Sequence, residues 1–156
     1  MEVKRVEDSL TEQTYLLMPK HSNGYGRLFG GKLVEWIDEM AGIVSRRHCQ
    51  TETTTACIDN LNFKASAKTG DMLVLRGKMT YVGTTSMEVR VDTYVEDLNG
   101  LRKMINRAYL VMVSVDENNN PIPVPGLAIE TESQKAEWES GMKRYALRKQ
   151  RRKEGY

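Results

Sequence analysis

The sequence predicts an α+β fold in which one long helix and one antiparallel sheet bury their apolar faces against each other. Only one long helical pattern precedes the C-terminal region, and a run of strand patterns follows it with no helix between them. Strands that come in a run favour α+β over a doubly wound parallel sheet. A chain of 156 residues buries roughly two-thirds of its unfolded surface, so it can form an ordinary core. We expect one domain over residues 1–130, followed by a C-terminal helix with a basic tail over residues 131–156.

The first half of the chain contains a strand, a loop and the long helix. The apolar run from Gln13 to Met18 predicts the strand, and residues 19–31 form a loop with four glycines. The helix should run from about Gly30 to about His48, because apolar residues recur there at helical spacing. That apolar stripe consists of Leu33, Trp36, Ile37, Met40, Ile43 and Val44.

Four strand patterns follow, over residues 53–64, 72–82, 86–96 and 104–115. In the first of them the apolar positions change face, which predicts a bulge near Asp59–Asn60. Asn99–Gly100 predicts a type I′ hairpin turn before the last strand. That last strand is apolar on both faces from Tyr109 onward, so it should be central or covered on both sides.

The C-terminal region contains a turn at residues 116–121, an extended segment at 122–126 and a final helix. We expect that helix to begin at Thr131, with Gln134 completing a capping box. Its apolar stripe would be Trp138, Met142 and Tyr145.

Composition excludes several classes of protein. Hydrophobic residues make up 40% of the chain and charged residues 28%, which is typical of a soluble globular domain. No apolar run approaches the ~18 residues of a membrane-spanning helix, and the charged N-terminus does not resemble a signal peptide. Cys49 and Cys57 form no disulfide or metal-ligand pattern, so we expect reduced thiols, a cytoplasmic location and no membrane partner.

The net charge of +2 is unevenly distributed. Residues 143–156 hold seven lysines and arginines and one glutamate, so the rest of the chain is mildly acidic. A nucleic-acid-binding protein needs a basic surface on its body, and we therefore expect no nucleic-acid partner. The tail is consistent with a solvated helix end or with a site that meets phosphates.

The glycine-rich loop allows two functional hypotheses. Residues 26–32 fit the pattern G-x-x-x-x-G-K of a nucleotidase phosphate loop, but Leu33 stands where the magnesium-binding hydroxyl would be. Such loops also belong to parallel βαβ cores, which the strand order disfavours. In the second hypothesis, the glycines let a ligand approach the first N–H groups of the helix, which can stabilise a developing oxyanion.

Asp38 and Asn23 are the candidate side chains for chemistry. Asp38 lies off the apolar stripe of the helix, beside the small residues Ala41 and Gly42, so a ligand or another chain has room next to its carboxylate. Such a carboxylate can act as a general base or a nucleophile, or it can simply belong to a solvated face. Asn23 is either part of an Asn-Gly turn or an amide aimed at a water or a carbonyl.

The segment Asn23 to Glu39 resembles the signature of the hotdog-fold acyl-CoA thioesterases, and in particular the bacterial acyl-CoA hydrolases related to the animal cytosolic ones. Weaker matches follow in the same order, and these are residues 59–63, 70–71, 82–87 and 121–125. The resemblance implies a long central helix wrapped by an antiparallel sheet. It also implies hydrolysis of acyl-CoA to a fatty acid and coenzyme A, with no metal and no organic cofactor.

Residue roles are implied by the same resemblance. Asp38 matches the catalytic carboxylate, Asn23 its partner amide, and the backbone N–H groups of Gly30 and Gly31 the oxyanion site. The active site would form between two protomers of a homodimer, itself often part of a trimer of dimers. Contacts to coenzyme A would come from Lys64, Thr85 and Ser86, whereas Thr84 stands where many members carry a basic residue. The alternative is a hotdog module that binds acyl-CoA or a nucleotide without turnover.

Overall fold

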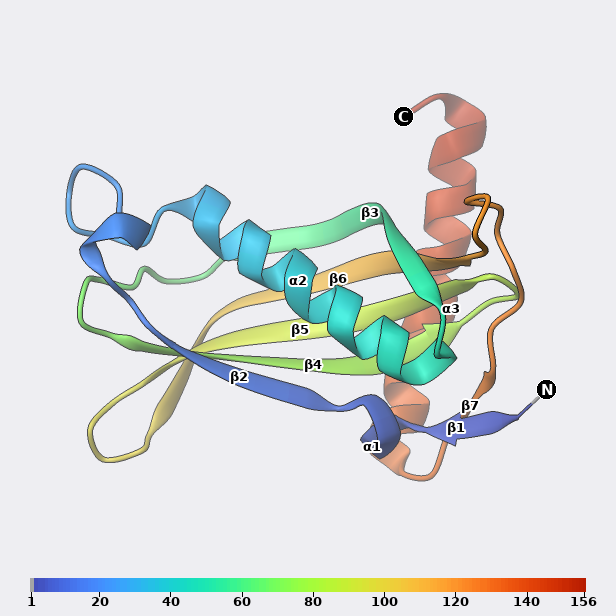
Figure 1. Ribbon diagram of the computed structural model, residues 1–156, viewed down its shortest axis with the longest axis horizontal. Helices are drawn as coiled ribbons and strands as arrows, with labels where there is room; N and C mark the ends of the chain where they lie inside the picture. The colour runs from blue at the N-terminus through green and yellow to red at the C-terminus, as the bar shows by residue number, and fades with distance from the viewer. Residues whose placement is uncertain (1) are drawn as a thin grey trace.

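The computed structural model describes residues 2–156, and Figure 1 shows the arrangement of its elements. In chain order these are β1 (Val3–Arg5), α1 (Val6–Ser9), β2 (Thr11–Leu16), a 3-10 turn (Pro19–His21), α2 (Gly30–Cys49), β3 (Glu52–Phe63), β4 (Met72–Val82), β5 (Ser86–Glu96), β6 (Arg102–Val115), β7 (Gly126–Ala128) and α3 (Glu132–Glu154). The predicted long helix, four-strand run and C-terminal helix are confirmed. The small elements β1, α1 and β7 are additions that the sequence patterns did not indicate.

The main sheet has five strands in the order β2-β4-β5-β6-β3, and all its pairings are antiparallel. The last strand of the predicted run, β6, is interior, as its apolar character predicts, and β3 forms a free edge. The short strands β1 and β7 pair in parallel as a separate ribbon. In Figure 1, α2 crosses one face of the main sheet and α3 lies across the other. No helix within residues 2–156 is both long and apolar enough to cross a membrane.

The core lies between α2 and the inner face of the sheet. Leu33, Ile37 and Val44 are fully buried there, as the predicted stripe requires, whereas Ile43 is only half-buried. Ala41, which we expected on the open side of the helix beside Asp38, is also fully buried. The stripe is therefore rotated slightly from its predicted position.

The helix α2 approaches the sheet closely at Gly77. A Cβ atom at this position would lie 2.8 Å from side-chain carbons of Met40 and Val44. Such a distance is below van der Waals contact, so only glycine allows this spacing between helix and sheet.

The bulge predicted in β3 is confirmed. The register of β3 against β6 shifts between Asp59 and Asn62, and Asn60 has a positive φ of 54°. A second shift, between Thr55 and Cys57, was not predicted. Together the two bulges bend this edge strand and change which residues face α2.

The type I′ turn predicted at Asn99–Gly100 is wrong. Type I′ needs positive φ at both central residues, but only Gly100 has one, at 82°. The Asp97 carbonyl instead accepts the N–H of Gly100, and the Asp97 carboxylate accepts the N–H groups of Asn99 and Leu101. The aspartate thus provides an alternative to the mirror-image turn.

The cap of α3 is close to the prediction. The hydroxyl of Thr131 accepts the N–H of Gln134 at 3.0 Å, while the Gln134 side chain accepts the N–H of Glu130 rather than that of Thr131. The predicted stripe is wrong at Met142, which is 50% exposed. Gly141 is buried in its place, between the half-buried Trp138 and Tyr145.

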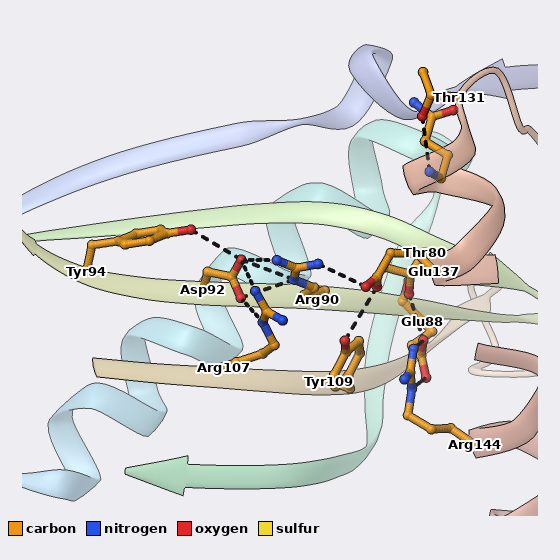
Figure 2. A network of polar contacts seen from close by, with 11 residues as sticks. Thr80, Glu88, Arg90, Asp92, Tyr94, Arg107, Tyr109, Thr131, Glu137 and Arg144 are labelled. Atoms are coloured by element: carbon orange, nitrogen blue, oxygen red, sulfur yellow. Dashed lines mark hydrogen bonds and ion pairs between the residues drawn. The ribbon is translucent and has the colours of Figure 1, made fainter. Parts of the chain in front are cut away.

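Ion pairs join α3 to the outer face of the sheet (Figure 2). Glu88 on β5 is only 1% exposed, and Arg144 on α3 donates to both of its oxygens, at 2.9 and 2.8 Å. The hydroxyl of Thr80 donates a third bond, at 2.7 Å. A buried carboxylate is tolerated only when it is paired in this way, so α3 is required to satisfy Glu88.

A second buried carboxylate, Asp92, is paired within the sheet. Arg90 and Arg107 donate to it at 2.7 and 2.8 Å, and Arg90 also reaches Glu137 on α3. Burial alone would raise the pKa of Asp92, but the hydrogen bonds and charges of the two arginines outweigh it and hold this pKa below its ordinary value.

Each tryptophan packs in a different layer of the molecule. Trp36 on α2 stacks on Tyr15 of β2 with ring centroids 4.3 Å apart, and His21 meets its edge. Trp138 on α3 packs against Tyr81 of β4, on the other side of the sheet.

We predict that Gly141→Ala destabilises the protein, although alanine is the better helix former. The new Cβ would lie 2.7 Å from the Cβ of Tyr81, and overpacking of this kind costs about 1–3 kcal/mol. The matched control is Gly42→Ala in α2, where nothing lies within 4 Å and helix propensity should add up to about 1 kcal/mol. Urea unfolding measures both, and a Gly141→Ala variant as stable as Gly42→Ala would contradict the close approach of α3.

We also predict that stability falls as the pH drops below about 6.5, the ordinary pKa of histidine. His48 is fully buried, and its Nε2 donates to the Pro125 carbonyl at 2.9 Å. Burial lowers the pKa of His48, and Lys4 lowers it further, against opposing effects from the Pro125 carbonyl and Asp8. The unfolded chain therefore takes up a proton at a pH where the folded chain does not.

The measurement is the free energy of unfolding in urea between pH 7.5 and 5.5. His48 should contribute a slope of at most about 1.4 kcal/mol per pH unit. In His48→Gln, whose amide can still donate to Pro125, the loss of stability toward low pH should be smaller. Equal slopes in the two proteins would exclude a buried neutral His48 as the cause.

Candidate active site

Asp38 is half-exposed on the side of α2 that faces β3. Its Oδ1 accepts a hydrogen bond of 2.6 Å from the hydroxyl of Thr55 on that strand. Two turns further along the helix, the hydroxyl of Ser45 donates to the hydroxyl of Thr53 at 3.1 Å. Because side chains alternate along a strand, Thr53 and Thr55 share the face of β3 that α2 covers.

The contact with Thr55 fixes one carboxylate oxygen of Asp38 and leaves the other available. A carboxylate held in this way by a rigid helix and strand can take a proton from water or attack a carbonyl carbon. Thr55 was missed at the sequence level. The threonine run at positions 53–55, with its period of two, was the available signal, but it does not indicate which helix residue the strand meets.

Asn23 orders the glycine-rich loop. Its Oδ1 accepts the N–H groups of Tyr25 at 2.9 Å and Arg27 at 3.3 Å, and Gly26 adopts the positive φ that this turn requires. Because two N–H donors occupy the oxygen, the amide NH₂ group is left free to donate. Asn23 can therefore both form the turn and offer its amide to a water or a carbonyl, because the turn leaves the amide nitrogen available.

The N-terminus of α2 presents unpaired backbone donors. Phe29 precedes the helix and provides no side-chain cap, and within residues 2–156 the N–H groups of Gly30 and Gly31 have no backbone acceptor. A Cβ at Gly31 would lie 2.7 Å from the exposed ring of Phe29, so the ring would have to turn aside for any larger residue. These N–H groups carry the positive end of the helix dipole and can stabilise an oxyanion.

The expected site residues are distributed over three places in one protomer. Asn23, Gly30 and Lys64 line one cavity of about 380 Å³, together with Leu33 and Phe63. Asp38 does not line that cavity, because it lies eight residues beyond Gly30, or about 12 Å along the helix axis. Thr85 and Ser86 line a different cavity of about 520 Å³.

The residues of the nucleotidase pattern do not form a nucleotidase site. Lys32 pairs with Glu35 of its own helix at 2.6 Å, and the antiparallel order of the main sheet provides no parallel βαβ core. Within residues 2–156, no three histidine, cysteine, aspartate or glutamate side chains gather closely enough to hold a metal ion.

A long helix wrapped by an antiparallel sheet, with a glycine-rich loop at its start and a carboxylate on its flank, defines the hotdog class of thioesterases. The family sequence model of the thioesterase superfamily matches residues 25–100 of this chain. The uncharacterised acyl-CoA thioester hydrolase YkhA of Bacillus subtilis is 35% identical over 97% of this chain and 89% of its own. The chain therefore belongs to the thioesterase superfamily, as the resemblance in its sequence indicates.

An animal relative matches nearly the whole chain but is longer. The cytosolic acyl coenzyme A thioester hydrolase of Rattus norvegicus is 34% identical over 97% of this chain, which spans only 40% of that protein's length.

Solved structures agree with the fold. A hexameric acyl-CoA thioesterase without ligand is 40% identical, with a TM-score of 0.92 and 97% of each chain covered. The acyl-CoA hydrolase of Staphylococcus aureus, solved with butyryl coenzyme A, coenzyme A and coenzyme A disulfide, is 32% identical, with a TM-score of 0.92 over 97% of this chain and 93% of that one. Structures also exist of its alanine variants at an asparagine, an aspartate and a threonine, which have the same spacing as Asn23, Asp38 and Thr55.

Proposed function

We propose that this protein hydrolyses acyl-CoA thioesters to a free fatty acid and coenzyme A, with Asp38 as the catalytic carboxylate. The observation that carries the proposal is the hydrogen bond that holds Asp38 against Thr55, on the flank of a helix whose N-terminus has free N–H donors. The relatives named acyl-CoA thioester hydrolases support the reaction. The matching spacing of the residues replaced in the Staphylococcus aureus enzyme supports the choice of residues.

The proposed chemistry follows from which atoms are free. The second oxygen of Asp38 accepts a proton from water while the water oxygen attacks the thioester carbonyl carbon. The amide of Asn23 and the N–H groups of Gly30 and Gly31 stabilise the oxyanion that forms. The carbon–sulfur bond then breaks, and the thiolate of coenzyme A takes up the proton that Asp38 holds, which restores the carboxylate. In the alternative route, Asp38 attacks the carbonyl directly, and water hydrolyses the resulting anhydride.

We place each active site between two protomers, with the Asn23 loop of one facing the Asp38 helix of its partner. Two observations support this assembly. Within residues 2–156, Asp38 does not line the cavity that Asn23 lines, and β3, which carries Thr55, is an edge strand of the main sheet. The hexamer formed by a similar thioesterase supports a trimer of such dimers.

The substrate contacts and the location complete the proposal. Lys64 lies in the Asn23 cavity and can bind an anionic group of the substrate, and Thr85 and Ser86 can contact coenzyme A from their own cavity. A cytoplasmic location is supported by the names of the animal relatives.

The competing candidate is a hotdog module that binds acyl-CoA without turnover. It uses the same loop and cavity, but it gives Asp38 no chemical role. The two functions differ in the outcome of one substitution.

We predict that Asp38→Asn lowers kcat by about 10²–10⁴, the usual contribution of a general base, while KM changes little. Thr55→Val should lower kcat less than Asp38→Asn does. Thr55→Ser should keep most of the activity, because the serine hydroxyl can still donate to Asp38. The control is Glu39→Gln, which removes an exposed carboxylate from the next position of α2. Thiol release from acetyl- to palmitoyl-CoA measures all four variants. Turnover by Asp38→Asn at the wild-type rate would remove Asp38 from the mechanism, and binding without turnover in the wild type would favour the module.

We predict that two inactive variants restore each other's activity. In a dimer of Asn23→Ala with Asp38→Asn, one of the two shared sites keeps both residues. Random pairing of co-expressed chains should therefore recover about a quarter of the wild-type activity, as a two-fold symmetric dimer requires. Light scattering checks that the mixture is oligomeric. Activity no higher than that of the separate variants would place Asn23 and Asp38 in the same protomer's site.

A further inference from the structure

His21 stands where the loop that carries Asn23 begins. The loop leaves the 3-10 turn at this residue and ends at Phe29, the residue before α2 (Figure 1). The backbone carbonyl of His21 accepts the N–H of Phe29 at 2.9 Å, which joins the two ends of the loop. His21 is thus the residue at which the loop closes.

The imidazole of His21 makes a second connection, to the segment that enters the loop. Its Nδ1 accepts the backbone N–H of Met18 at 3.0 Å, while the backbone N–H of His21 donates to the Met18 carbonyl at 2.9 Å. Glutamate or glutamine makes the same side-chain contact at the third position of a capping box. The two bonds hold the chain in a defined turn immediately before the loop.

The same imidazole contacts the helix that carries the backbone donors. It crosses the ring of Trp36 in a T-shaped contact with ring centroids 4.9 Å apart, and the buried Trp36 also stacks on Tyr15 of β2. Trp36 lies on α2 between Gly30, where the helix begins, and Asp38. His21 therefore connects the start of the loop, the end of the loop and the helix.

The proposed reaction requires the loop and the helix start to be aligned. The amide NH₂ group of Asn23 and the N–H groups of Gly30 and Gly31 must reach one oxyanion, although they lie toward opposite ends of the loop. Such donors stabilise developing charge only when their positions are fixed before it forms. A displacement of about 1 Å can lower a rate by up to about 10²-fold, even when its cause lies far from the reacting atoms.

The contact with Met18 defines the protonation state of His21. A backbone N–H can only donate, so Nδ1 must be unprotonated and the ring proton lies on Nε2. A second proton, on Nδ1, would place two N–H groups opposite each other and break the bond to Met18. The turn before the loop therefore requires neutral His21.

The surroundings of His21 favour this neutral form. Burial lowers the pKa of His21, and the charges of Lys20 in the 3-10 turn and Lys32 on α2 lower it further, against the opposing effect of Glu35 on α2. The titratable group that β2 contributes is Tyr15, which is neutral in this range because burial raises its pKa. His21 thus takes up a proton only below about pH 6.5, the ordinary pKa of histidine.

We propose that His21 is a positioning residue whose neutral imidazole keeps the Asn23 amide aligned with the N–H donors of Gly30 and Gly31, and whose protonation releases this alignment. The role rests on the proposed function, because the thioester oxyanion defines the alignment. It is an indirect role, since Nδ1 faces Met18 and, within residues 2–156, His21 does not line the cavity that Asn23 lines. Activity is therefore present at neutral pH and falls below about pH 6.5 while the protein stays folded.

The test is the pH dependence of acyl-CoA hydrolysis between pH 5.5 and 8. His21→Gln keeps an acceptor for the Met18 N–H but cannot take up a proton. It should keep kcat within about threefold at pH 7.5 and should lose the fall below pH 6.5. His21→Leu keeps an apolar contact with Trp36 but offers no acceptor, so it should lower kcat about tenfold at every pH. KM should change little in either variant, because the donors act mainly on the transition state.

Two controls separate positioning from stability. His48→Gln removes the other histidine of the chain, and it should leave the fall in kcat below pH 6.5 in place. Circular dichroism measures the amount of folded protein in each variant. A merely structural role for His21 would change that amount and would leave the pH profile of the remaining activity unaltered.

The state of the imidazole is measured without catalysis. In His48→Gln, His21 is the only histidine, so its NMR titration gives its pKa and shows which ring nitrogen carries the proton. The pKa should lie below 6.5, with the proton on Nε2. The amide protons of Met18 and Phe29 should exchange with solvent faster once His21 is protonated, because the loop then loosens.

The outcomes separate this proposal from the proposed function. A fall in kcat that disappears in His21→Gln but persists in His48→Gln supports the proposal. The same fall in the wild type and His21→Gln, no fall in the wild type, or a proton on Nδ1 at pH 7.5 overturns it. A wild type that hydrolyses no acyl-CoA contradicts the proposed function, and the NMR titration and amide exchange then still decide whether protonation of His21 loosens the loop.

Discussion

The burial of one helical stripe against a curved sheet is the constraint on which the rest of this structure depends. Leu33, Ile37 and Val44 must all leave water, so the rotation of α2 about its axis is fixed. That rotation determines what the rest of the helix presents. Asp38 is directed toward β3 and meets Thr55, and the helix start meets the glycine-rich loop. The chemistry is thus placed by hydrophobic packing, which is non-directional, and adjusted by one hydrogen bond, which is directional.

The outer face of the sheet follows a different physical rule. There the contacts are mostly charged, and Glu88 and Asp92 are buried as ions paired with arginines. Such pairs contribute little net stability compared with apolar contacts, but each is costly if one partner is missing. They therefore select one arrangement of α3 over alternatives. Glu88 also reaches Arg148 at 3.3 Å, and Arg148 lines the cavity of about 520 Å³, so the docking of α3 fixes one wall of that cavity as well.

Local patterns predicted the elements that depend on local periodicity. The helix from Gly30, the strands at 72–82 and 86–96 and the bulge near Asp59 all follow from spacing of apolar residues. The prediction of a type I′ turn after β5 was wrong because the carboxylate of Asp97, two residues before Asn99, accepts the N–H groups of the turn.

Long-range contacts were the part that the sequence could not indicate. Gly141 replaces Met142 in the contact of α3 because the sheet comes too close for a side chain, a distance that no pattern within the helix encodes. Asn23 and Asp38 were found through their resemblance to a family motif, whereas Thr55 and the arginine-lined cavity needed the packing of β3 against both helices. The roles of these residues, and the division of the chain at residues 130 and 131, stay predictions.

The two tryptophans lie on opposite faces of the sheet, one in the layer of α2 and one in the layer of α3. Trp36 stacks on Tyr15 close to the Asn23 loop, and Trp138 packs on Tyr81 beneath α3. Replacement of either tryptophan by phenylalanine leaves a single tryptophan, whose fluorescence reports on the inner layer or on the outer layer alone. The molecule thus carries its own optical labels for asking whether the helix that carries the arginines and the helix that carries the carboxylate loosen together or one before the other.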